Sequence, residues 1–390
     1  MRSRTRMPIR ALGELFDGPH ATPTRRSDGP YFLNIASLKS GRLDLSESDH
    51  VSADDFIKWT RRVTPQPEDL LFSYETRLGE AALMPEGIEA CLGRRMALLR
   101  PNRSVVDPRY LLYFYLSPFF QRLIAKNTIH GATVPRIGLA SMPSWEVEIP
   151  SDLTEQQAIA DVLGALDDKI AANQNEVNSS EQLAILSASR ASRQIRLASI
   201  IKQSKTQLHP RAFDPLVAHF SLPAFDAAGT PAIEAANTIK SNKSVVTEPA
   251  VLVSKLNPRI PRLWDVPTIP DCMAIASTEF VILVPIGVSS TVLWAALRQP
   301  LVTSDLASKV AGTSGSHQRV KPSEVMDLRV GDPLTLDSET RDFITGLGRL
   351  VYARRAESIR LAATREELLP LLMSGRIRVR DAEKVVEEVV

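Results

Sequence analysis

Two segments of the chain place apolar residues at coiled-coil spacing. In the first segment, apolar residues recur at a spacing near 3.5 residues. They are Ile159, Leu163, Leu166, Ile170, Val177, Leu183 or Ala184, and Leu186. Such spacing is typical of a helix that buries one seam against another helix. Thr154-Glu155-Gln156-Gln157 fits a capping box with Thr154 as the N-cap, and after Gly164 no proline or glycine follows before about residue 200. We therefore predict a helix over 154–204.

The second segment begins near Ser338 and has a weaker seam. Its apolar positions are Phe343, Leu347, Leu350, Leu361, Leu368 and Leu371. Pro370 is expected to kink or end this helix. We predict a helix over 338–376 that pairs with the first helix, and a C-terminal tail over 377–390. Asn173 interrupts the first seam, and two interpretations stay open: a buried residue that fixes the register, or a solvated side chain.

The second half of the chain repeats the pattern of the first half, about 180 residues later. Five features recur in the same order: a buried strand (69–74 and 250–255), an apolar helical segment (110–124 and 291–306), a glycine loop with an arginine (131–136 and 312–319), a short strand (145–149 and 327–330) and a long helix. This order predicts a duplication. The two globular parts are then 1–153 and 205–337.

Composition narrows the class of protein. With 44% hydrophobic residues the chain can bury a core, and with a net charge of only +2 any nucleic-acid surface must come from local placement of Lys and Arg. Cys91 and Cys272 are too far apart for a ligand motif, so we expect two free thiols in a reducing cytosol. The N-terminal arginines precede no apolar segment of the kind that a signal peptide needs, and we expect a cytoplasmic protein.

Motifs that carry catalysis are missing from the sequence. There is no phosphate loop and no His-Glu-x-x-His, and the six histidines are scattered. Asn257-Pro258 lacks the second proline and the aromatic residue of an amino-methyltransferase loop. We therefore expect no enzyme activity, no metal and no cofactor. Two alternatives stay open, a divergent nuclease or methyltransferase and a coiled-coil scaffold unrelated to DNA.

A basic stretch follows the first helical seam. No acidic residue lies between Glu181 and Asp214, and Arg190, Arg193 and Arg196 fall three apart, near one face of the expected helix. This stretch is either a DNA-facing stripe or a solvated face.

Several segments resemble one known family, the specificity subunits of type I restriction-modification systems. Leu153–Leu163 and Leu166–Ile170 are similar to the family's central helix, Ser241–Lys243 and Val251–Arg259 to a segment of its second target-recognition domain, and Leu368–Arg376 to the end of its distal helix. The resemblance implies an α+β fold, in which two long antiparallel coiled-coil helices separate two target-recognition domains in a pseudo-two-fold internal repeat. The chain departs from the family at Ala21-Thr22-Pro23, where a Gly-x-Thr-Pro is usual, and at the start of the second helix, which lacks Thr-Glu-Gln-Gln.

The resemblance also implies a function. Each domain would read half of a bipartite site in double-stranded DNA. The helices would set the gap and dock two methyltransferase subunits, with restriction and translocase subunits in the full complex. An orphan or related modification system is an alternative. Base and phosphate contacts require polar or cationic side chains on loops. The expected DNA-binding residues are Lys39, Arg42, Tyr74, Arg77, Thr133, Arg136, Lys240, Lys243, Lys255, Asn257, Arg259, His317 and Arg319. The expected partner-binding residues are Glu155, Gln156, Asp167 and Asp168.

Overall fold

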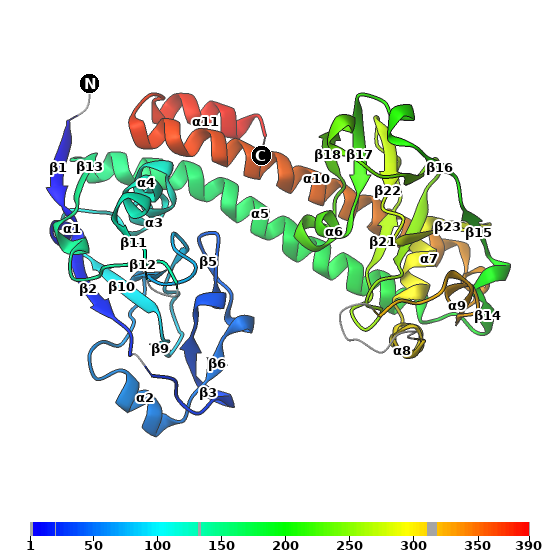
Figure 1. The fold of residues 1–390 in the computed structure, drawn as a ribbon, viewed down its shortest axis with the longest axis horizontal. Coiled ribbons are helices and arrows are strands. Elements are labelled where there is room, and N and C mark those ends of the chain that lie inside the picture. The colour runs from blue at the N-terminus through cyan, green and yellow to red at the C-terminus, as the bar shows by residue number, and fades with distance from the viewer. Residues whose placement is uncertain (1–2, 20, 132–133, 310–317, 390) are drawn as a thin grey trace. The chain divides into compact units, whose positions relative to one another are not determined.

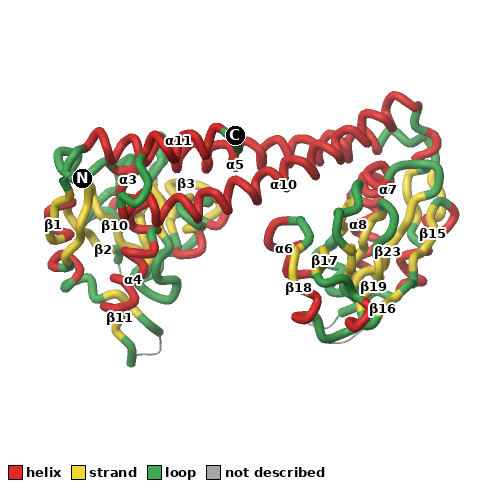
Figure 2. The backbone as a smooth tube through the Cα atoms, turned by 90° about the horizontal axis from the view of Figure 1, so that it is seen from above, coloured by secondary structure: helices red, strands yellow, loops and turns green. Residues whose placement is uncertain are grey.

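The computed structural model describes residues 3–19, 21–131, 134–309 and 318–389. They form two compact units, of which the first comprises 1–168 with 361–390 and the second 169–360. Each unit combines a β-rich part with segments of the same two long helices (Figure 1, Figure 2). Thr133 and His317, both expected to bind DNA, lie outside the described residues.

The first unit is built on a four-stranded antiparallel sheet. Its strand order is β2 (Gly13–Asp17), β10 (Met96–Pro101), β7 (Leu70–Ser73) and β8 (Ala81–Leu83). Smaller pairings join β1 (Arg4–Pro8) to β13 (Glu146–Pro150), β4 (Leu38–Lys39) to β5 (Arg42–Leu43), β11 (Thr128–Ile129) to β12 (Arg136–Ile137), and β3 (Arg26–Leu33) to both β6 (Asp49–His50) and β9 (Ala90–Leu92). Its helices are α1 (Ile9–Leu12), α2 (Ala53–Trp59), α3 (Pro108–Leu116) and α4 (Pro118–Asn127).

The second unit repeats this plan. Its four-stranded sheet has the order β15 (Ile201–Ser204), β23 (Phe280–Pro285), β20 (Ala250–Ser254) and β21 (Leu263–Val266). A second sheet has the order β16 (Gln207–Leu208), β19 (Lys243–Val245), β22 (Met273–Ala276), β17 (Leu216–Phe220) and β18 (Ala232–Ala235), and β14 (Gln194–Arg196) pairs with β24 (Arg329–Gly331). Its helices are α6 (Leu222–Ala228), α7 (Ser290–Leu297), α8 (Pro300–Ser308) and α9 (Pro322–Met326).

The matching topologies support the duplication. In both units the four-stranded sheet has equivalent strands in the same spatial order. Each unit also has another sheet that contains one parallel pair of strands, β3 with β9 in the first unit and β17 with β22 in the second. The predicted strands at 69–74 and 250–255 are β7 and β20, which are buried on both faces. The α+β fold class is confirmed.

The apolar helical segments differ from the prediction. Each is two helices, because a proline starts the second one and cannot supply the N–H that would continue the first. Pro118 follows Ser117, whose hydroxyl accepts from the backbone N–H of Phe120 and caps α4, and Pro300 starts α8.

The first long helix, α5, runs over Leu153–Ala188 and is shorter than the predicted 154–204. Residues 189–204 instead contain β14 and β15, because Leu197, Ile200 and Ile201 are buried in the core of the second unit and pairing with β24 and β23 satisfies the backbone. The basic stretch therefore does not form a helical stripe, and Arg193 and Arg196 form ion pairs with Asp332 and Asp327. The cap also differs, since Asp152 and not Thr154 accepts a backbone hydrogen bond at the helix start.

The second long helix, α10, runs over Ser338–Ser374 and continues four residues past Pro370. Pro370 therefore does not end the helix, and the alternative, a kink at this residue, stays a prediction. Asp337 caps its start as Asp152 caps α5, which is a further match between the halves. The expected tail contains another helix, α11 (Val379–Glu387).

The seam between α5 and α10 largely follows the prediction on α5, whereas on α10 two of the six predicted positions, Leu361 and Leu368, are buried. On α5 the buried residues include Ile159, Leu163, Leu166, Val177 and Ala184, and on α10 they are Ile344, Val351, Leu361, Leu368 and Leu372. Of the alternatives Leu183 and Ala184, Ala184 is the buried one, while Leu186 and Phe343 are exposed, so placing those two in the seam was wrong. Within each unit the helices pack antiparallel, through Asp167 with Arg365 in the first and Glu181 with Arg355 in the second.

Candidate functional site

Equivalent turns follow β7 in the first unit and β20 in the second. The Ser73 hydroxyl donates to the Glu75 carbonyl (2.8 Å), and the Ser254 hydroxyl donates to the Leu256 carbonyl (3.1 Å). The next residue has a positive φ in both, 72° at Thr76 and 50° at Asn257. Thr76 is strained in this conformation because a β-branched residue rarely adopts it. Strain of this kind gathers at functional sites.

The arginine loop returns to this turn in both units. In the first unit Ile137 N donates to the Tyr74 carbonyl (2.8 Å), and Glu75 and Arg136 form an isolated antiparallel bridge. In the second unit Val320 N donates to the Lys255 carbonyl (3.0 Å), and Leu256 and Arg319 form the matching bridge. Arg136 and Arg319 therefore occupy equivalent positions.

A third segment flanks each turn on its other side. Tyr74 N donates to the Arg95 carbonyl (3.1 Å), and Lys255 N donates to the Glu279 carbonyl (2.8 Å). We call residues 73–77, 95 and 135–137 the first strand-end cluster, and residues 254–257, 279 and 318–320 the second strand-end cluster.

The charges of the two clusters are arranged differently. In the first, Arg95 forms an ion pair with Glu75 (2.7 Å), while Arg136 is exposed and has no ion pair within the described parts of the chain. In the second, Arg319 forms a two-point contact with Glu279, with Nε 3.1 Å and Nη2 3.0 Å from the carboxylate oxygens. The hydrogen bond to Glu279 raises the pKa of Arg319, so this guanidinium is charged at all ordinary pH values.

The remaining strand-end residues have mixed surroundings. Tyr74 is buried, and burial raises the pKa of its phenol. Arg77 donates to the Ile35 carbonyl (3.1 Å) and to Glu80 (3.3 Å), which fixes it to its own unit. Lys255 is half-buried and Arg259 is exposed. The clusters therefore bring together Tyr74, Arg77 and Arg136 in one unit, and Lys255, Asn257 and Arg319 in the other.

The predicted phosphate contacts lie outside these clusters. Lys39 binds Asp44 (2.7 Å) and Glu47 (3.1 Å), and these two hydrogen bonds raise its pKa. Arg42 donates to the Asp167 carbonyl on α5, and Lys240 and Lys243 bond to Asn237 and Ser241 nearby in the chain. Sequence reasoning missed Arg95 and Glu279, although both stand immediately before equivalent strands, β10 and β23.

The predicted partner-binding residues on α5 divide into two groups. Gln156 is fully buried and bonds to Asp107 N, the Val105 carbonyl and the Pro150 carbonyl, so its prediction as an exposed contact is wrong. Asp167 accepts from the Tyr113 hydroxyl (2.8 Å) and from Arg365 (2.6 Å), which turns it toward its own unit. Glu155 is half-buried and Asp168 is exposed.

Asn173 lies in a polar layer of the second unit. It is buried, and its amide donates to Glu357 (3.0 Å) and Ser358 (3.3 Å) of α10. Lys169 (3.7 Å) and Arg354 (2.9 Å) also contact the Glu357 carboxylate. Burial alone would raise the pKa of Glu357, but these partners lower it below its usual value. The solvated interpretation of Asn173 is therefore wrong.

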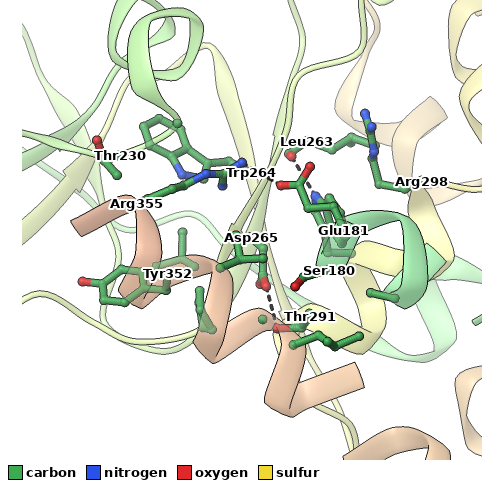
Figure 3. Close-up of a pocket in the computed structure, with 18 of the residues that line it drawn as sticks. Ser180, Glu181, Thr230, Leu263, Trp264, Asp265, Thr291, Arg298, Tyr352 and Arg355 are labelled. Atoms are coloured by element: carbon green, nitrogen blue, oxygen red, sulfur yellow. Dashed lines mark hydrogen bonds and ion pairs between the residues drawn. The ribbon is translucent and has the colours of Figure 1, made fainter. Parts of the chain in front are cut away.

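A cavity of about 190 Å³ lies in the second unit, beside α5, α7 and α10. Asp265 and Thr291 meet in it, with a hydrogen bond of 2.5 Å from the threonine hydroxyl, and Arg355 pairs with Glu181 nearby (Figure 3). Burial raises the pKa of Asp265 to about 6. Apart from Asp265 and Thr291, the described side chains that line this cavity do not pair a nucleophile with a base. We therefore assign no catalytic activity to the cavity.

The described residues include neither a metal-binding group nor a helix that could span a membrane. No group of three or more His, Cys, Asp or Glu side chains among them is arranged to hold a metal ion, and Cys91 and Cys272 are both free thiols. Among the same residues no helix has both the length and the apolar character that crossing a membrane requires.

Comparisons with known proteins agree with this architecture. Residues 41–181 match the model of a family described as the type I restriction modification DNA specificity domain. This match identifies residues 41–181, which run from the first β-rich part into α5, as a type I DNA specificity domain. One curated relative of this chain is a putative type I restriction enzyme MjaX specificity subunit from Methanocaldococcus jannaschii, 30% identical over 177 residues. That match covers 42% of this chain and 40% of the relative, so it spans less than half the relative's length.

The fold of the chain also matches a solved structure. The crystal structure of a type I restriction-modification system S subunit from M. genitalium has a TM-score of 0.61, with 14% identity, 95% of this chain covered and 96% of that chain. This likeness shows the fold, two β-rich domains with long paired helices.

Proposed function

We propose that this chain is the specificity subunit of a type I restriction-modification system, that it reads a bipartite sequence in double-stranded DNA, and that it carries out no chemistry of its own. The repeated strand-end cluster is the observation that carries the proposal. Each cluster presents an arginine at an equivalent place, Arg136 in one unit and Arg319 in the other. Because two similar surfaces are suited to two similar tasks, one half-site for each unit is the simplest assignment.

The side chains of the clusters are of the kinds that DNA recognition uses. Arginine and asparagine can each make two hydrogen bonds to a base edge, and cations contact phosphates. Arg136, Arg259 and Arg319 are exposed, and Asn257 and Lys255 are partly so. A binding surface made from such local groups is compatible with the small net charge of +2.

Methyltransferase subunits are the proposed partners, and restriction subunits would join them in the full complex. We assign their docking surface to the exposed face at the start of α5, which includes Asp168 and the half-buried Glu155. Gln156 and Asp167 hold this part of α5 in place. A subunit with these partners acts on chromosomal DNA, so we place it in the cytoplasm.

The paired helices are proposed to set the gap between the half-sites. Both α5 and α10 continue without interruption through the positions where one unit gives way to the other, at 168–169 and 360–361. A continuous helix transmits a change of length, since each residue adds about 1.5 Å. The gap is then a property of the helices, and the base sequence a property of the clusters.

The proposal is tested by reconstitution with the methyltransferase subunits and S-adenosylmethionine. Methylation-aware sequencing of exposed genomic DNA should reveal one motif with two fixed parts and an unspecified gap. Either partner alone should leave the DNA unmodified. Turnover by the purified specificity subunit alone, or a motif with one continuous part, would contradict the proposal.

A further inference from the structure

The contact between Glu279 and Arg319 fixes the plane of the arginine side chain. The carboxylate takes Nε at 3.1 Å and Nη2 at 3.0 Å, so both of its oxygens bind one edge of the guanidinium. Single-point ion pairs on a protein surface contribute little order. A two-point contact adds geometric specificity, because both groups are planar.

The backbone on both sides of this pair is also fixed. The segment 255–256 lies between the two residues, since Lys255 N donates to the Glu279 carbonyl (2.8 Å) and Leu256 forms the bridge with Arg319. Val320 N, the next residue, donates to the Lys255 carbonyl (3.0 Å). The backbone segments that carry both side chains are therefore held by the shared segment 255–256.

The contact leaves a second edge of the guanidinium available. Arginine has five N–H donors, and Glu279 uses one on Nε and one on Nη2. The remaining donors lie on Nη1 and on the outer side of Nη2, and the Arg319 side chain is half exposed. That outer edge is the fork that matches O6 and N7 of guanine in the major groove.

We propose that Arg319 reads a guanine in one half of the DNA site, and that Glu279 is the positioning residue that aims it. This inference rests on the proposed function of the chain. A pre-oriented side chain loses less freedom on binding and discriminates better between bases.

The first strand-end cluster shows why Arg319 is singled out. There the place of Glu279 is taken by Arg95, and the carboxylate of Glu75 pairs with Arg95. Arg136, the equivalent of Arg319, therefore has no carboxylate partner among the described residues. Because no carboxylate fixes its orientation, Arg136 is suited to a phosphate contact, which carries no base specificity.

The test compares the motifs methylated by complexes that contain Arg319→Lys or Glu279→Gln. Arg319→Lys keeps the charge but loses the fork, and Glu279→Gln keeps the shape but loses the two-point contact. Both should relax a single guanine position in one half-site, with discrimination lowered about 5- to 150-fold for the lysine variant and less for the glutamine variant. The other half-site should be unchanged.

Arg196→Lys is the matched control, because Arg196 is an exposed, ion-paired arginine of the same unit that lies on β14. It should leave every position of the motif as it is. If Arg319→Lys lowers methylation of all sequences equally, Arg319 contacts phosphate and the inference is overturned. If Arg319→Lys changes a position but Glu279→Gln does not, the positioning role of Glu279 is overturned. A wild-type complex without any bipartite motif would contradict the proposed function instead.

Discussion

Asn173 of α5 donates a hydrogen bond of 3.0 Å to Glu357 of α10, within a mostly apolar seam. Such a polar pair is satisfied in one alignment of the two helices, because any shift by a heptad would leave the buried amide without its partners. The surrounding charges of Lys169 and Arg354 strengthen this requirement. Asn173 therefore specifies the alignment of the pair.

Removing the Asn173 amide should destabilise the second unit. We expect Asn173→Ala to lower the free energy of unfolding by about 1–3 kcal/mol, because Ser358 and Glu357 lose a buried partner. Urea titration followed by circular dichroism measures this change. Asn175→Ala, at an exposed position two residues further along α5, should have almost no effect. Equal effects of the two variants would show that Asn173 is not part of a buried layer.

Adjacent aspartates on α5 should respond differently to charge reversal. Asp168→Lys changes an exposed residue, so the protein should fold normally and co-purify less with methyltransferase subunits. Asp167→Lys would place a cation beside Arg365 and deprive Tyr113 of its acceptor, so it should cost about 3 kcal/mol of stability. Thermal unfolding and a pull-down with the partner separate these effects. A stable Asp168→Lys protein with undiminished partner binding would remove Asp168 from the docking surface.

The sequence predicted the periodic and repeated features of this fold, and the reason is physical. Ile159, Leu163 and Leu166 repeat at a spacing that requires a buried seam, so the helix that carries them could be found. The end of α5 at Ala188 could not, because strand pairing of 194–196 with β24 depends on residues more than a hundred positions away. Likewise, Gln156 fits an exposed capping box in sequence, and only the fold surrounds it with Val105 and Pro150.

The candidate site was predicted in part for the same reason. Arg136 and Arg319 stand out because their loops recur at matching places in the two halves. Glu279 lies 40 positions before Arg319, and no local pattern marks it as the partner of that arginine.

The raised pKa of Asp265 should make the stability of the second unit depend on pH. Burial raises the pKa of this carboxyl from 3.8 to about 6, so the folded state favours the protonated form. The contribution is fully present below the unfolded pKa and is lost as pH rises from about 4 through about 6. Relative to Asp265→Asn, the wild-type protein should lose roughly 2–3 kcal/mol across this range.

Urea unfolding of both proteins at several pH values between 4 and 8 measures that difference. Glu248→Gln, which alters an exposed carboxylate of the same unit, is the control and should follow the wild-type curve. A constant difference between wild type and Asp265→Asn at all pH values would show that Asp265 titrates normally.

The central claim is that the two units read two half-sites whose separation is set by α5 and α10. One heptad inserted between Asp168 and Lys169, together with one between Arg360 and Leu361, lengthens both helices and keeps the contacts within each unit. Seven residues add about 10 Å, the length of about three base pairs of DNA. A whole heptad also preserves the seam.

The deciding measurement is the motif that this double-insertion variant methylates, read by methylation-aware sequencing beside the wild-type motif. The account predicts that both half-sites keep their sequence while the gap between them widens by about three base pairs. A motif whose half-sites change while its gap stays constant would contradict it.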